Sequence, residues 1–306
     1  REGRIGATMR EEAKEFLKNL NIAVIGLGLM GGSYAKRLRE QTKCRITAFD
    51  REAETLNKAL ADGVIDAGYT EGNEELKKAD LLIVCLSRDN MLSFLRQNAV
   101  YLREGQTLTD IIGIKGNSVE AAEKLLPNGV DYVPAHPMAG REGFGYDMSR
   151  ADVFDCANYI IVPSKRTSRK GVQTVENLAR ALGCSHISVV TTEEHDRRIA
   201  YTSCLPHVLA TALVNSPSMD GSMGRFIAGS FKDATRVADI NAALWARLLL
   251  ADKKALLQEI ARFKEGLDKV EISLLQGDKE GLEEFLKEAG ARRRELVHEY
   301  RKGQHE

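Results

Sequence analysis

Short apolar runs alternate with amphipathic stretches through the first 190 residues. The runs cover residues 21–26, 44–50, 80–87, 106–112, 131–136 and 158–163. Runs of this length that are apolar on both faces are typical of strands buried in a parallel sheet. The segments between them, such as 51–62 and 117–126, have helical spacing, and residues 171–190 show a helix followed by a strand. This alternation predicts a doubly wound α/β domain with a mostly parallel sheet.

The pattern changes near residue 191. The segment "TTEEHDRRIA" places Thr191 three residues before Glu194, which is a capping-box pattern for a helix start. Helical spacing then continues to the end, so we expect one domain over 1–191, with an exposed helical extension over 1–20, and an all-helical domain over 192–306. The long apolar helix faces favour a homodimer, with burial inside one chain as the alternative. We interpret the charged tail, 291–306, as a solvated helix face.

Charge and composition exclude several classes of protein. The 306 residues carry 44 basic and 44 acidic side chains, so no global field favours nucleic acid or a membrane surface. The longest apolar runs are too short to cross a bilayer and the N-terminus lacks an apolar signal core, so we expect a cytoplasmic protein. The five cysteines form no close pair, which favours buried reduced thiols and no metal site. They are Cys44, Cys85, Cys156, Cys184 and Cys204.

A glycine motif, "VIGLGLMGGS", follows the first apolar run directly and precedes a helical stretch. Gly26 permits a tight turn, Gly28 lets the backbone approach a pyrophosphate, and Gly31 lets the helix pack on the strand. The helix N-terminus, with Leu29 and Met30, then faces the phosphates. This context predicts a Rossmann-type dinucleotide site, and a glycine turn without a ligand is the alternative.

The second run ends at Asp50, whose carboxylate is suited to the ribose hydroxyls of NAD and would repel a 2′-phosphate. Arg51 follows and weakens the preference for NAD over NADP, so NADP is the alternative cofactor. Ser87, at the end of the third run, is a further candidate cofactor contact.

The stretch "AHPMAGREGFG" places His136 at the carboxyl end of a predicted strand, where ligands bind in open α/β sheets. A histidine titrates near neutral pH, which suits a group that accepts a proton while a hydride leaves. A histidine that merely satisfies a turn is the alternative.

The second domain carries a cationic pattern in "GSFKDATR". Gly229, Lys232 and Arg236 share one face of a helix, which suits an anionic substrate, especially one with two carboxylates. The alternatives are an exposed basic stripe, or pairing of Arg236 with Asp233.

Two aromatic residues of this domain are also candidates. His207 follows Pro206, which we expect to kink an apolar helix. Trp245 is the only tryptophan and is either core or a pocket wall.

Four stretches in this order, "VIGLGLMGGS", "AHPMAG", "HDRRIAYTSCLPHVLA" and "GSFKDATRVADINAALW", resemble the prephenate and arogenate dehydrogenases of tyrosine biosynthesis. The resemblance extends from about residue 20 to about residue 265. It implies NAD-dependent oxidative decarboxylation of a cyclohexadienol, which becomes aromatic as carbon dioxide leaves.

The resemblance also implies roles for individual residues. His136 would accept a hydrogen bond and then the proton of the ring hydroxyl, and Arg236 would hold the ring carboxylate. The remaining substrate-site residues implied are His207, Gly229, Lys232, Trp245 contributed across a dimer, Glu142, Asp233 and His195.

Three positions depart from the family pattern. Gly113 stands where the family has a serine that orients the histidine, Cys204 replaces a histidine, and Arg141 replaces a threonine. These departures indicate a shifted substrate, lower activity or drift within one branch.

Three rival functions remain. A dehydrogenase of the β-hydroxyacid type shares the glycine motif but leaves "HPMAG" unexplained. A dinucleotide-binding regulator without turnover is favoured by Gly113 alone. A related dehydrogenase acting on an amino-substituted prephenate would differ only in its substrate.

Overall fold

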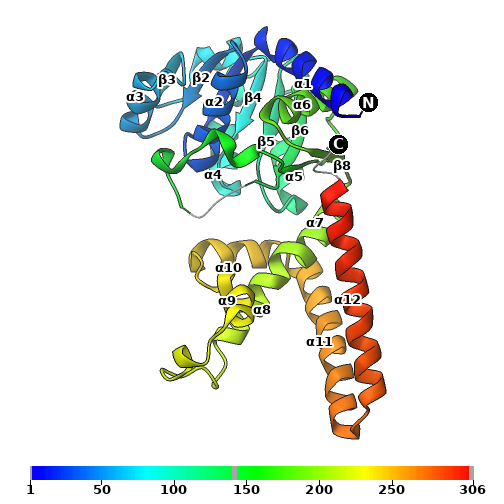
Figure 1. Cartoon of the computed structure of the whole chain (residues 1–306). Coiled ribbons are helices and arrows are strands. Elements are labelled where there is room, and N and C mark those ends of the chain that lie inside the picture. Colours follow the sequence, from blue (N-terminus) through cyan, green and yellow to red (C-terminus); the bar gives the residue numbers. More distant parts are fainter. Residues whose placement is uncertain (1, 140–142, 303–306) are drawn as a thin grey trace. The chain divides into compact units, whose positions relative to one another are not determined.

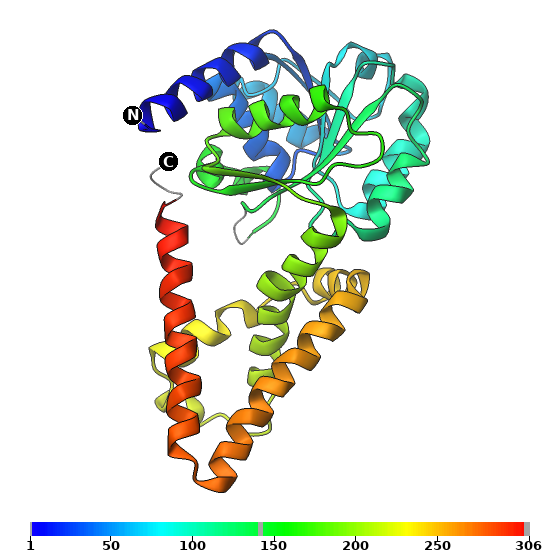
Figure 2. The same ribbon diagram turned by 90° about the vertical axis from the view of Figure 1, so that its right-hand side faces the viewer.

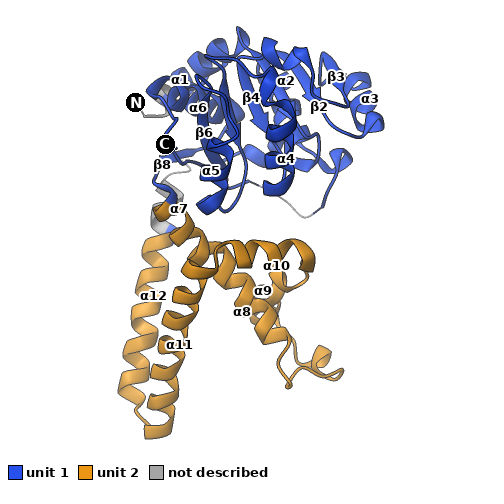
Figure 3. Ribbon diagram, turned by 180° about the vertical axis from the view of Figure 1, so that it is seen from behind, with its two compact units in different colours: residues 1–192, 297–306 blue, residues 193–296 orange. Residues whose placement is uncertain are grey.

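The computed structural model describes residues 2–139 and 143–302, with side chains described for residues 6–139 and 143–297. The chain forms two compact units, coloured separately in Figure 3. Unit 1 comprises residues 1–192 with 297–306, and unit 2 comprises residues 193–296. The division after residue 192 adjoins the change of pattern seen in the sequence near residue 191.

Unit 1 contains one sheet, in which the described residues form eight strands in the order β3-β2-β1-β4-β5-β6-β7-β8 (Figure 1). This result confirms the predicted doubly wound α/β fold. The strands are β1 (Asn21–Ile25), β2 (Arg45–Phe49), β3 (Ala67–Tyr69), β4 (Leu81–Val84), β5 (Thr107–Asp110), β6 (Asp131–Pro137), β7 (Asn158–Ile161) and β8 (His186–Val189).

Strands β3 to β6 pair in parallel, in the order expected of a dinucleotide-binding sheet. Strand β7 then runs antiparallel to β6 and parallel to β8. Parallel strands need cover on both faces, which explains why all four residues of β4 are buried. Strand β3 was not predicted, because a strand of three residues is too short to show a periodicity.

Helices cover both faces of the sheet. One apolar cluster joins one face to α1 (Glu2–Lys18), α2 (Leu29–Gln41), α3 (Ala53–Ala61) and α6 (Arg169–Leu182). A second cluster joins the other face to α4 (Arg88–Asn98) and α5 (Gly116–Glu123). Short 3-10 turns complete the unit, namely η1 (Glu74–Lys78), η2 (Ala99–Tyr101), η3 (Tyr146–Met148) and η4 (Ala151–Phe154).

Helix α1 corrects one expectation. We predicted an exposed extension, but α1 packs along α6 (Figure 2), and Ala13 and Leu17 are 0% exposed. These two residues are four positions apart and share one face of the helix. This narrow apolar stripe is enough to pack α1 against the fold, although most of its other side chains are polar or charged.

In its described residues unit 2 is helical. It contains α7 (Thr192–Ile199), the π-helical turn η5 (Ala200–Cys204), α8 (Leu205–Val214), η6 (Met223–Arg225), α9 (Gly229–Thr235), η7 (Arg236–Ala238), α10 (Ala242–Ala251), α11 (Lys253–Gln276) and most of α12 (Lys279–Lys302). Pro206 lies in the first turn of α8, directly after η5. The expected kink is therefore a π-helical turn, after which a proline in the first turn of a new helix costs little.

The cysteines also differ from expectation at one position. All five are free, but Cys156 is exposed and has a backbone φ of 59°. It follows the short turn η4 rather than lying within a strand, so the nearby apolar run does not bury it.

Candidate active site

The glycine loop between β1 and α2 leaves no room for side chains at two of its positions. Gly26 has a φ of +88°, and a Cβ there would lie 2.9 Å from the carbonyl oxygen of Cys85. A Cβ on Gly31 would lie 1.7 Å from the carbonyl oxygen of Gly26. These contacts bring α2 against β1, as the motif predicts.

The third glycine opens the loop toward solvent. A Cβ on Gly28 would meet nothing within 4 Å, and no side chain caps α2 at this residue. The first N–H groups of α2, at Leu29 and Met30, therefore form an uncapped positive helix end. This combination fits a phosphate group.

Asp50 lies at the end of β2 and is tied to the glycine loop. Its Oδ2 accepts a hydrogen bond from Leu27 N at 2.7 Å, and its Oδ1 accepts one from Glu52 N at 2.9 Å. These two backbone donors fix the orientation of the carboxylate.

A cleft with a volume of about 730 Å³ runs along the carboxyl ends of β1, β2 and β4. Asp50, Arg51 and Glu71 line it, and the Arg51 guanidinium is 3.2 Å from the Glu52 carboxylate. The acidic groups in the cleft thus outnumber unpaired basic ones. Further residues that line it, which the sequence analysis did not identify, are Phe49, Thr70, Asn90, Phe94 and Tyr101.

Ser87 lines the same cleft at the N-terminus of α4. Cys85 lines it too, and burial raises the pKa of its thiol far above the ordinary value, so the group stays uncharged. Ser87 is therefore placed for a polar contact, while Cys85 provides an apolar wall.

His136 lies on β6, where it pairs with Ile160 of β7. Strand β5 ends at Asp110, opposite Pro134, so His136 stands beyond the end of β5 and is half-buried. Strand β6 is the third strand along from β1, which corresponds to about 14 Å at ordinary strand spacing. That separation suits the far end of an extended dinucleotide.

Gly113 lies beside the ring of His136. A Cβ on Gly113 would be 3.6 Å from both Cε1 and Nε2 of His136, an ordinary van der Waals contact. The site therefore has room for the serine that the family pattern places here. Glu142 and Arg141, two other positions of interest, lie outside the described residues.

The cationic pattern of unit 2 divides between two elements. Gly229 and Lys232 lie on α9, whereas Arg236 follows its last residue and begins η7. The expected single helix therefore ends one residue early, although Arg236 keeps helical dihedral angles (φ −50°, ψ −37°).

These cations are exposed and uncompensated. In the described part of the chain neither Lys232 nor Arg236 forms an ion pair, so the alternative pairing of Arg236 with Asp233 is not observed. A Cβ on Gly229 would meet nothing within 4 Å. Two free cations beside open space suit an anionic ligand.

His207 and Trp245 stack within one chain. Their ring centroids are 3.6 Å apart with an interplanar angle of 25°. The His207 Nδ1 lies 2.8 Å from the carbonyl oxygen of Ser203, which can only accept, so Nδ1 carries the hydrogen. The Nε2 atom is then the one left to contact a ligand.

His195 is placed differently. It is only 1% exposed, and its Nδ1 lies 2.6 Å from Asp196 Oδ1. Burial to this degree does not favour the direct substrate contact that the family pattern implies. His195 more readily serves as a buried support for its neighbours.

Asp252 and Cys204 lie near this pair in unit 2. Burial, followed by the neighbouring charge of Asp196, raises the pKa of Asp252 to about 6. Its Oδ2 is buried without a hydrogen-bond partner among the described residues. Burial also raises the pKa of the Cys204 thiol to about 11, so Cys204 does not supply a charge in place of the histidine that it replaces.

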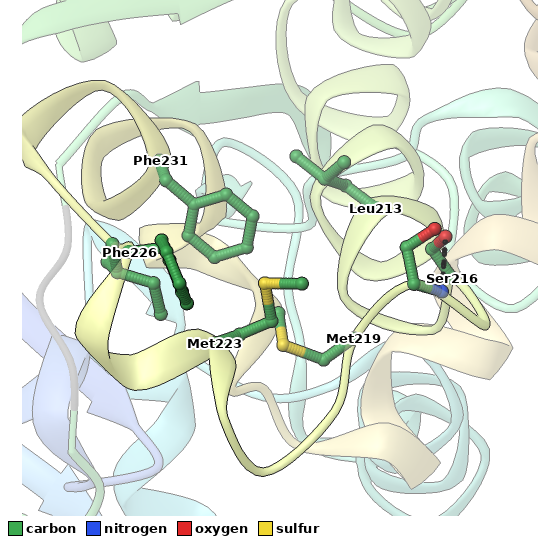
Figure 4. A pocket seen from close by; sticks show the side chains of 8 residues that line it. Leu213, Ser216, Met219, Met223, Phe226 and Phe231 are labelled. Carbon is green, nitrogen blue, oxygen red and sulfur yellow. Dashed lines mark hydrogen bonds between the residues drawn. The ribbon is translucent and has the colours of Figure 1, made fainter.

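A separate hollow of about 170 Å³ opens between α8 and α9 (Figure 4). Phe226, Phe231, Met219 and Met223 line it, with no charged side chain among its lining residues. Such a surface does not fit a dicarboxylate.

The described residues contain no group of three or more His, Cys, Asp or Glu side chains that could hold a metal ion. None of their helices combines the length and hydropathy needed to span a membrane.

Comparison with known proteins follows the same two-part division. Residues 34–188 match the family description "Prephenate dehydrogenase, nucleotide-binding domain", and residues 191–288 match "Prephenate dehydrogenase, dimerization domain". The chain is 31% identical over 274 residues to the prephenate dehydrogenase of Bacillus subtilis, covering 88% of this chain and 74% of that protein. It is 29% identical over 275 residues to the cyclohexadienyl dehydrogenase of Zymomonas mobilis, covering 88% and 93%.

A solved structure agrees in fold. The crystal structure of prephenate dehydrogenase from A. aeolicus, in complex with hydroxyphenyl propionate and NAD+, has a TM-score of 0.81 at 29% identity. The match covers 90% of this chain and 98% of that chain.

Proposed function

The chain belongs to the prephenate dehydrogenase family, and from this premise we propose that it oxidatively decarboxylates prephenate or arogenate. It is an oxidoreductase, and NAD is its cofactor. The products are 4-hydroxyphenylpyruvate from prephenate and tyrosine from arogenate. The observation that carries the proposal is His136, half-buried beyond the end of β5 on the edge of the sheet that also holds the glycine loop.

The glycine loop and Asp50 fit a dinucleotide. The uncapped start of α2 and the open space at Gly28 suit its pyrophosphate, and the Asp50 carboxylate suits a ribose. Asp50 and Glu71 disfavour a 2′-phosphate, which supports NAD over NADP. When bound, NAD supplies the hydride acceptor.

His136 acts on the substrate hydroxyl. Its imidazole accepts the hydrogen bond of the ring hydroxyl and takes that proton as the carbinol carbon is oxidised. Loss of carbon dioxide makes the ring aromatic, so the protein mainly has to orient the ring and remove one proton.

The cations of unit 2 bind the substrate anions. Arg236 presents a planar fork suited to the ring carboxylate, and Lys232 adds a second positive charge. His207, held by Ser203 and stacked on Trp245, presents Nε2 to the substrate side chain.

Unit 2 also carries the proposed homodimer. Helices α9 and α10 contain no buried residue, and Leu250 and Leu275 are 71% and 80% exposed. Apolar faces of this extent are typical of a surface that a second subunit covers. Light scattering on the purified chain tests this, with twice the chain mass expected.

The test of the activity is NADH formation with prephenate and arogenate supplied in parallel to the unmodified chain. We expect turnover of at least one substrate, and the faster one defines the specificity. If neither yields NADH while NAD still binds, dehydrogenation of these two substrates is wrong. An amino-substituted prephenate would then be assayed next.

A further inference from the structure

The loop that follows β5 holds a buried ion pair. Lys115 Nζ lies 2.6 Å from Asp110 Oδ1, and each side chain is 1% exposed. Neither residue was predicted, because the sequence around a charged residue does not show that it is buried.

Both partners have further hydrogen bonds. Asp110 Oδ1 accepts a bond from Ile112 N at 2.8 Å, and Oδ2 accepts one from the Tyr132 hydroxyl at 2.8 Å. Lys115 Nζ also donates to the carbonyl oxygen of Ala135 at 2.5 Å. These bonds offset the desolvation of two buried charges.

The ion pair fixes the positions of the groups around it more than it stabilises the fold. A buried ion pair replaced by neutral groups of similar volume often leaves a protein equally stable. A neutral pair would lose the hydrogen bond from Lys115 Nζ to the Ala135 carbonyl oxygen. This carbonyl belongs to the peptide group directly before His136, so the bond connects that group to Asp110 on β5.

The same loop also reaches the His136 ring. Gly113 lies between Asp110 and Lys115 in sequence, and its Cβ position is 3.6 Å from the imidazole. One loop therefore binds the peptide group before His136 through Lys115 and lies beside the His136 ring at Gly113.

We propose that the Asp110–Lys115 ion pair positions His136 for proton acceptance. The two residues are positioning residues, because Lys115 donates to the carbonyl oxygen directly before His136 and Asp110 holds Lys115. This inference rests on the proposed role of His136 as the base.

The test compares Lys115→Met, Asp110→Asn and the double variant. Each single variant leaves one charge buried without its partner, so its thermal stability falls, while the double variant regains most of it. We expect kcat of the double variant to stay about 10- to 100-fold low, as for a misplaced catalytic group, with KM for NAD near the unmodified value.

The pH profile separates charge from position. Lys115→Met leaves an anion near His136 and shifts the acidic limb of kcat, where the base becomes protonated, to higher pH, and Asp110→Asn shifts this limb to lower pH. The double variant removes both charges, so the acidic limb of its kcat profile returns to the pH seen for the unmodified chain, while kcat itself stays low. A double variant that recovers both stability and kcat would overturn the proposal.

A control ion pair lies near the β3 edge of the sheet, with side chains that are 30% and 38% exposed. Arg39 pairs with Asp66 at 2.8 Å, and Asp66 also accepts a bond from Ile46 N at 2.7 Å. We expect the variant Arg39→Met/Asp66→Asn to keep kcat. An equal loss of kcat there would show that the effect is general and would contradict positioning.

Two further variants complete the design. If the double variant fails to fold, Lys115→Gln replaces it. Glutamine keeps a hydrogen-bond donor for Asp110 on a shorter side chain. An unchanged kcat for Lys115→Gln would overturn the proposal. His136→Ala separates the two hypotheses. If His136→Ala stays active, His136 is not the base. If His136→Ala loses activity while the Asp110/Lys115 double variant keeps full activity, only the positioning role is contradicted.

Discussion

The imidazole of His207 lies almost flat on the indole of Trp245, 3.6 Å between ring centroids, within a single chain. The resemblance to the family implied a tryptophan contributed across a dimer. The stack shows that Trp245 contacts a histidine of its own chain. Together with the bond from Nδ1 to Ser203, it fixes both the tilt and the tautomer of His207.

Replacing Trp245 tests this orientation. We expect Trp245→Ala to raise KM for the substrate about 3- to 10-fold, because an aromatic pair contributes about 0.5–1.5 kcal/mol. Trp245→Phe keeps an aromatic face and should recover most of the loss. Initial-rate measurements decide, and equal KM values for the two variants would contradict a stacking role.

Gly113 offers a variant that should improve the enzyme. Gly113→Ser fits beside His136 and adds a hydroxyl, so we expect kcat to rise about 2- to 10-fold, the effect of one hydrogen bond. Gly113→Ala is the matched control, because it adds the same Cβ without the hydroxyl. Equal kcat for the two variants would show that no such bond forms.

The acidic cleft predicts cofactor choice. Asp50→Asn should weaken NAD binding about tenfold or more, since it removes a charged acceptor of ribose hydrogen bonds. Glu71→Lys should strengthen NADP binding while leaving NAD binding nearly unchanged. Titration of the unmodified chain with both dinucleotides provides the reference, and equal affinities there would refute the discrimination.

Asp252 predicts how stability depends on pH. Its pKa of about 6 lies above the ordinary value of 3.8, so the folded chain holds this proton more tightly than the unfolded chain. Its contribution to stability is therefore greatest below pH 4 and is lost as the pH rises to about 6. Asp252→Asn should raise the free energy of unfolding by about 1–3 kcal/mol at pH 8 and change it little at pH 4.

Denaturant unfolding at the two pH values measures this effect. Exposed Asp268 on α11 supplies the control, because Asp268→Asn should leave stability unchanged at both. A gain for Asp252→Asn that is equal at pH 4 and pH 8 would show that its proton is not responsible.

Much of unit 1 could be predicted because parallel strands bury both faces. That burial demands continuous apolar runs, and each such run in the sequence became a strand. The antiparallel direction of β7 could not be read, since an apolar run carries no sign of its direction. Strand β3 was too short to show a pattern.

The site was predictable only in part. Gly26, Gly28 and Gly31 act through local backbone geometry, which a motif records directly. The ties of Lys115 to Asp110 and to Ala135 depend on β5 and β6 lying side by side, and no local pattern shows that a lysine is buried. The stack of His207 on Trp245 likewise joins two residues 38 positions apart in sequence, on different helices.

The most direct measurement of the central claim is the rate of NADH formation by His136→Ala beside the unmodified chain, with NAD binding measured on both. Our account predicts that NAD binding is retained and that kcat on the better substrate falls by about 100-fold or more. A variant that binds NAD and keeps most of its turnover would contradict His136 as the base.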